Sequence, residues 1–178
     1  MHRLLALLLA CLALNAHADT VTICYNYGCH REASVTFSHN ELQQIHALFR
    51  HDKTAADERQ DIARAIGRFE SFAGRQTPIY RDKGGNANDD GVDGRMDCID
   101  HSIDTTAYLR LLERRGWLKF HRVLPRIKRA PLLVDVHWGA RIIERETHRQ
   151  YVVDSWFFDN GHPAAIFKLR DWLDGASP

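Results

Sequence analysis

The segment 95–102 constrains this chain most, because it places a cysteine where a helix begins, directly after a long polar loop. Residues 84–94 are rich in glycine, asparagine and aspartate, which predicts an exposed loop. Apolar side chains then recur at helical spacing over 99–112, and Gly116 is placed to end the helix. Cys98 is therefore predicted to lie at a helix N-terminus, where free amide N–H groups favour a thiolate.

The first eighteen residues have the pattern of a secretory signal peptide. Residues 1–3 include a basic residue, residues 4–14 form an apolar run, and 16–18 match a small-x-small cleavage site. The run is too short to span a bilayer, and no later stretch is apolar for long enough to do so. We therefore expect a periplasmic or secreted protein, with lipid attachment through Cys11 as a minor alternative.

Residues 19–178 are expected to form a single domain. About 160 residues can bury a core without a metal ion or disulfide bonds to stabilise it. Removal of the signal peptide takes Arg3 from the 24 basic residues and none of the 23 acidic residues. This balance gives no electrostatic reason to expect a nucleic acid partner.

The remaining cysteines divide into a close pair and a single residue. Close cysteines tend to pair in an oxidising compartment, and Cys24 and Cys29 flank the turn-like sequence 25–28. We expect a small hairpin disulfide there. Cys98 is then the odd cysteine, which is either buried and inert or exposed for chemistry.

Local patterns predict an α+β fold in which the Cys98 helix packs on an antiparallel sheet and is preceded by two helices. Residues 19–37 alternate on both sides of a turn, which indicates a β-hairpin. Ser38 heads a capping box for the first helix, Thr54 caps the second, and Gly74 is placed to end it. Three strands and a short terminal helix complete the expected elements: 118–124, 132–144, 150–157 and 169–173.

Two of these strands are joined by a polar turn, and their register decides which side chains meet. A turn centred between Arg145 and Glu146 places His137 directly opposite Asp154, with Cβ atoms about 5 Å apart. A shift of one residue in this pairing would move the side chains of one strand to the opposite face of the sheet. The register therefore supports Cys98 as nucleophile, His137 as base and Asp154 as the residue that orients the base. It also gathers apolar side chains on the other face: Val134, Val136, Trp138, Ala140, Ile142, Tyr151 and Val153.

Each of these three residues has a structural alternative. Cys98 could be a core thiol, His137 a strand histidine with satisfied hydrogen bonds, and Asp154 a carboxylate bonded to the backbone. His101, one helical turn after Cys98, is a competing base, although a residue on the same helix points alongside the thiol.

The order of a cysteine on a helix, a histidine on a strand and an aspartate on the next strand resembles the transglutaminase-like branch of the papain-like superfamily. Within it, the chain looks most like the bacterial transglutaminase-like cysteine peptidases, a periplasmic group that includes a calcium-dependent protease. Their nucleophile lies in a Gly-Asp-Cys-Glu-Asp-Tyr sequence. Residues 97–100 keep the flanking acids, while Ile99 replaces the glutamate and His101 replaces the tyrosine.

The resemblance covers residues 93–156. It implies a papain-like or transglutaminase-like core, Cys98 as nucleophile, His137 as base and Asp154 as orienting residue. It also implies an acyl-enzyme route on a peptide or glutamine amide.

The loop before the helix partly resembles a calcium-binding EF-hand loop, because hard oxygen donors recur along it around a glycine. A solvated turn of the same composition is the alternative. The backbone N–H of Cys98 is expected to form part of an oxyanion hole, with Asn86 and Asn88 as further donors. The candidate calcium ligands are Asn86, Asn88, Asp90, Asp97 and Asp100.

The leading hypothesis is an exported, thiol-dependent acyl-transfer enzyme, a cysteine peptidase or amidase acting on a protein or peptide amide. A calcium-stabilised binding domain of the cell envelope that does not use the thiol is the alternative. A redox protein is poorly supported, because Cys24 and Cys29 lack the two-residue spacing of redox dithiols. Zinc is set aside, because the histidines are scattered without ligand spacing.

Overall fold

The computed structural model describes residues 18–130 and 136–178. The predicted signal peptide lies outside the described residues apart from its last residue, Ala18. Val134 and the expected start of the strand at residue 132 also lie outside them. Within the described chain, no helix has the length and apolar character needed to cross a membrane.

The chain begins with the predicted β-hairpin. β1 (Asp19–Tyr25) pairs antiparallel with β2 (Arg31–Phe37), and Cys24 and Cys29 form a disulfide across the turn. Asn26, Gly28 and Cys29 all have positive φ, so the turn needs residues that tolerate the left-handed region. Both the hairpin and its disulfide are confirmed, and the disulfide is consistent with an oxidising compartment.

Capping residues begin the three long helices where the sequence places them. Ser38 caps α1 (His39–His46) and Thr54 caps α2 (Ala55–Gly74), each through a reciprocal capping box. Asp97 caps α3 (Cys98–Arg114) in the same way, and Gly116 follows it with a φ of 69°. Two 3-10 turns lie between these helices, at Ala47–His51 and Pro78–Arg81.

The second half of the chain forms an antiparallel sheet with the order β3-β4-β5-β6. The strands are β3 (His121–Arg129), β4 (His137–Glu144), β5 (Gln150–Asp154) and β6 (Ala165–Lys168). The short helix α4 (Leu169–Leu173) follows β6 at the position expected for it. The described residues thus form four α-helices and two antiparallel sheets, compatible with the predicted α+β class.

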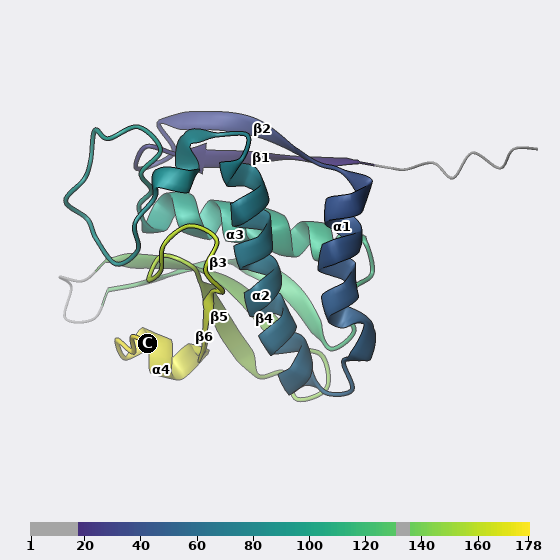
Figure 1. The fold of residues 1–178 in the computed structure, drawn as a ribbon. Coiled ribbons are helices and arrows are strands. Elements are labelled where there is room, and N and C mark those ends of the chain that lie inside the picture. The colour runs from purple at the N-terminus through teal and green to yellow at the C-terminus, as the bar shows by residue number, and fades with distance from the viewer. Residues whose placement is uncertain (1–17, 131–135) are drawn as a thin grey trace, which may run out of the picture.

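Helix α3 lies between the hairpin and the four-stranded sheet, and helix α2 crosses α3 (Figure 1). The elements share one hydrophobic core, at whose centre three aromatic rings meet. The ring of Phe37 from β2 lies 4.8 Å from that of Phe69 in α2, and Phe69 stacks at 5.0 Å on Tyr108 of α3. This packing holds the helix that begins with Cys98 against both sheets.

Three expectations about the sheet need correction. The turn between β4 and β5 is closed by Glu144 and Arg149, so Val153 pairs with Ala140 rather than with Trp138. The predicted register is therefore wrong by two residues. Because side chains alternate with a period of two, this shift keeps every side chain on its predicted face.

The strand boundaries also differ from those expected. β3 begins at His121 and continues through Pro125 to Arg129, where the sequence suggested an end at Leu124. β5 ends at Asp154 instead of residue 157, and β6 was not expected at all. Its sequence is only four residues long, too short for a strand period to stand out.

Candidate functional site

Cys98 is the first residue of α3 and is partly exposed. The Asp97 carboxylate accepts hydrogen bonds from the N–H groups of Ile99 and Asp100, both at 3.0 Å. The Asp100 side chain in turn accepts one from the Asp97 N–H at 3.3 Å. This reciprocal cap fixes the first turn of the helix and with it the position of the thiol.

The hairpin turn is attached to the same end of α3. Asp100 Oδ1 accepts a hydrogen bond from the Cys29 N–H at 2.6 Å, and Asp104 Oδ1 accepts one from the Cys24 N–H at 2.7 Å. Burial, together with the neighbouring charge of Asp97, raises the pKa of Asp100 to about 6 despite its N–H donors. The disulfide hairpin is thus part of the support of the Cys98 helix.

His137 and Asp154 meet at the end of the sheet. His137 is the first residue of β4 and Asp154 is the last of β5. Both residues are buried, with exposed fractions of 4% and 2%. His137 Nε2 lies 2.8 Å from Asp154 Oδ2. In the observed register they are diagonal neighbours on one face of the sheet, not the directly opposed pair that was predicted.

The thiol of Cys98 is close enough to His137 to affect the pKa of the imidazole. Burial lowers the pKa of His137, but hydrogen bonds to Asp154 and to Cys98 outweigh it and raise the pKa to about 9. The structure therefore brings together Cys98, His137 and Asp154, from three separate elements. A pKa of about 9 keeps the histidine protonated at neutral pH, with the Asp154 carboxylate 2.8 Å from its Nε2 atom.

Aromatic side chains enclose the imidazole and one of them contacts the carboxylate. Trp172 of α4 is fully buried, and its indole N–H donates to Asp154 Oδ2 at 2.8 Å. The rings of Trp156 and Phe157 lie 4.9 and 5.6 Å from that of His137. Sequence analysis missed the role of Trp172, because the short helix that carries it gives no indication of where it packs.

The competing base, His101, is fully occupied by other partners. Its ring nitrogens lie 2.8 Å from Ser155 Oγ and 3.0 Å from Asp82 Oδ2, and Glu70 lies 3.7 Å away. Burial lowers the pKa of His101, yet the two carboxylates hold it well above the usual value. This histidine joins the loop, α3 and the end of β5, and neither nitrogen is directed at the thiol.

Asp90, Asp97 and Asp100, the carboxylates among the predicted calcium ligands, do not form one cluster in the part of the chain that the structure describes, and calcium binding stays a prediction. The carboxylates of Asp97 and Asp100 accept backbone N–H groups, as described above, while Asn88 and Asp90 are exposed. Asn86 Nδ2 donates one of its two N–H groups to the Lys83 carbonyl at 2.8 Å, and Asn86 Oδ1 has no hydrogen-bond partner among the described residues. Residues 18–130 and 136–178 contain one cluster of three side chains of the types that bind metal ions, Cys24, Cys29 and Glu32. Both cysteines of this cluster are in the disulfide.

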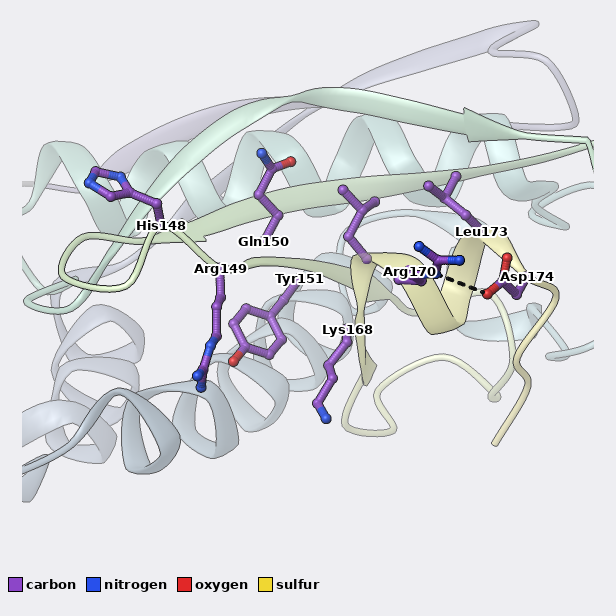
Figure 2. Close-up of a pocket in the computed structure, with 9 residues that line it drawn as sticks. His148, Arg149, Gln150, Tyr151, Lys168, Arg170, Leu173 and Asp174 are labelled. Atoms are coloured by element: carbon purple, nitrogen blue, oxygen red, sulfur yellow. Dashed lines mark ion pairs between the residues drawn. The ribbon is translucent and has the colours of Figure 1, made fainter.

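A separate pocket of about 510 Å³ lies beside the turn between β4 and β5 and the start of α4 (Figure 2). Arg149 and Lys168 lie on either side of the Tyr151 side chain there, and Arg170 pairs with Asp174 at 3.7 Å (Figure 2). None of the three residues Cys98, His137 and Asp154 lines this pocket.

No family model matches this chain, and neither the curated proteins nor the solved structures include a match to it.

Proposed function

We propose that the protein is a thiol-dependent acyl-transfer enzyme, a cysteine peptidase or amidase that acts on a protein or peptide amide. The observation that carries this proposal is the convergence of a helix N-terminal thiol, a buried histidine and a buried carboxylate. A nucleophile, a base and a group that orients the base are the parts that such catalysis needs. A papain-like or transglutaminase-like core would account for the order of the three residues.

The chemistry follows from the charges in the site. The Cys98 thiolate attacks the carbonyl carbon of the amide, and the His137 imidazolium protonates the departing amine as the C–N bond breaks. Water or a second amine then attacks the thioester and gives its proton to neutral His137, and the C–S bond breaks to release the acid or the new amide and restore the Cys98 thiolate. The Asp154 carboxylate holds the imidazole in place and stabilises its charged form throughout.

The N-terminus of α3 is suited to the developing oxyanion. The N–H of Cys98 lies in the first turn of the helix, where amides have no partner within the helix. The Asp97 side chain takes the N–H groups of Ile99 and Asp100, so it leaves the N–H of Cys98 for the substrate oxygen.

The first test is the rate of Cys98 alkylation by iodoacetamide against pH, followed by mass spectrometry of the peptide that carries the residue. We expect the reaction to persist at pH 6, where only about 0.3% of a free thiol with a pKa near 8.5 is ionised. His137→Ala should reduce the rate at pH 6 at least about tenfold, because the ion pair is lost. Asp154→Asn should reduce it in the same direction by a smaller factor.

His39→Ala is the matched control, since His39 is an exposed histidine at the start of α1. Cys98→Ala measures the background, including any reaction at Cys11. A wild-type rate that simply follows the titration of an ordinary thiol, and that His137→Ala leaves unchanged, would refute the proposal. Cys98 would then be structural, and a binding domain would become the better interpretation.

A further inference from the structure

Arg126 lies beside the nucleophile at an irregularity in the edge strand β3. Leu124 pairs with Arg141 and Ile127 with Gly139, so β3 carries one extra residue between these pairs. Such a bulge redirects a side chain and is common next to active sites. Pro125, which has no N–H to donate, occupies the unpaired position before Arg126.

The bulge directs the guanidinium toward the first turn of α3. Arg126 Nη1 lies 2.9 Å from Ser102 Oγ and 3.5 Å from the Ile99 carbonyl oxygen. The guanidinium carbon lies 5.0 Å from the centre of the Trp138 ring, whose residue directly follows His137. Burial lowers the pKa of Arg126, and the nearby Cys98 opposes this effect.

The charge of Arg126 is not neutralised by a carboxylate within residues 18–130 and 136–178. Two other partly buried arginines are paired with carboxylates: Arg59 with Glu144 at 3.0 Å and Arg110 with Glu113 at 2.7 Å. Arg126 remains partly exposed, and only its Nη1 atom contributes to the hydrogen bonds described above. A planar guanidinium with free donors beside a reactive sulfur is suited to receive a carboxylate in two parallel hydrogen bonds.

We propose that Arg126 selects substrates that carry a carboxylate next to the scissile amide, either an acidic side chain or a free C-terminal carboxylate. This inference rests on the proposed function, because it assigns a substrate class to the same site. The stacking on Trp138 and the bond to Ser102 hold the guanidinium in place before a substrate arrives, which reduces the entropy cost of binding.

The test compares two alkylating reagents that differ in charge. Iodoacetate carries a carboxylate one bond from its reacting carbon, and iodoacetamide is its neutral counterpart. In both, the Cys98 sulfur forms a bond to the CH2 carbon and iodide leaves with the bonding electron pair. Both reagents react with the same thiolate, so both rates depend equally on the fraction of the thiol that is ionised. The ratio of the two rates is therefore independent of that fraction.

We expect the iodoacetate to iodoacetamide ratio to fall about three- to tenfold in Arg126→Gln. Arg126→Lys is a second variant if Gln impairs folding, and it should lower the ratio less than Gln, because it retains the charge but not the two parallel donors. Arg122→Gln is the matched control, since Arg122 is an exposed cation on the same strand. It should leave the ratio unchanged.

A second pair of reagents distinguishes the two sources of the carboxylate. Acetyl-Asp and acetyl-Asn chloromethyl ketones alkylate the same sulfur with loss of chloride, and differ in side-chain charge. A preference for Asp that Arg126→Gln removes indicates an acidic side chain. If iodoacetate alone depends on Arg126, a C-terminal carboxylate is indicated.

The proposal is overturned if Arg126→Gln changes neither ratio, because an arginine that only braces α3 and Trp138 would not discriminate charge.

The measurement is repeated at pH 9.5, where an ordinary thiol is also ionised. A failure of the proposed function would slow both reagents at pH 6, but would leave the charge ratio at pH 9.5 measurable. The two failures are therefore distinguishable.

Discussion

His101 and His137 are both buried beside carboxylates, and their remaining contacts separate their roles. His101 has both nitrogens in hydrogen bonds to Ser155 and Asp82, so it joins segments of the fold. His137 has one nitrogen at Asp154 and is also hydrogen-bonded to Cys98. Of these two histidines, His137 is therefore the one that interacts with the thiol.

At this scale the raised pKa of His137 predicts a pH dependence of stability. Its pKa rises from 6.5 to about 9 on folding, so the folded state binds the proton more tightly. The resulting stabilisation is fully present below pH 6.5 and is lost as the pH rises through 9. We expect the free energy of unfolding lost in His137→Gln to be about 3 kcal/mol larger at pH 6 than at pH 9.5.

Urea unfolding of both proteins at several pH values measures this difference. A loss that stays constant between pH 6 and 9.5, or that grows with pH, would contradict the assignment of a charged His137.

Among the elements, the hairpin and α3 act as one unit. In addition to the bonds from Cys24 and Cys29 to the helix, the Asn26 N–H donates to the Arg95 carbonyl at 2.8 Å. The Asn26 side chain accepts from the Gly94 N–H at 2.7 Å. The turn closed by the disulfide therefore also holds the end of the loop that leads into Cys98.

Removal of the disulfide in a Cys24→Ser, Cys29→Ser double variant should lower the free energy of unfolding by about 2 kcal/mol. This is the loop-closure contribution of a cross-link that spans so few residues. Guanidinium unfolding of the variant and the oxidised wild type gives the difference, and reduced wild type should match the variant. An unchanged midpoint would mean that contacts with α3 alone hold the turn.

At the scale of the whole molecule, stability is expected to come from the core and the caps without calcium. The acidic residues at the start of α3 are already hydrogen-bonded to backbone N–H groups, and the shared aromatic core packs the helix from both sides. We therefore expect a calcium chelator to leave both the thermal midpoint and the alkylation rate of Cys98 unchanged.

Thermal unfolding and alkylation, each with EDTA and with added calcium, provide the measurement. A fall of several degrees in the midpoint with EDTA, reversed by calcium, would show that the loop binds the ion with ligands other than these capped carboxylates.

The sequence by itself determined the features that depend on neighbours along the chain. Ser38, Thr54 and Asp97 cap helices because their side chains reach amides two or three residues ahead. The same local rules place Cys98 at a helix N-terminus. The alternation of side chains along two strands predicted that His137 and Asp154 lie on one face of the sheet. This prediction holds although the predicted register is wrong by two residues, because a shift of two keeps each side chain on its face.

Only the tertiary structure decided what depends on contacts between distant segments. Three features bring together residues that are far apart in sequence. They are the bulge that directs Arg126, the added strand β6 and the hydrogen bond from Trp172 to Asp154. No local pattern encodes them, because their energies come from packing partners that are absent until the chain is folded. The meeting of Cys98 with His137 belongs to this group, since it requires α3 and the sheet to pack at one particular position.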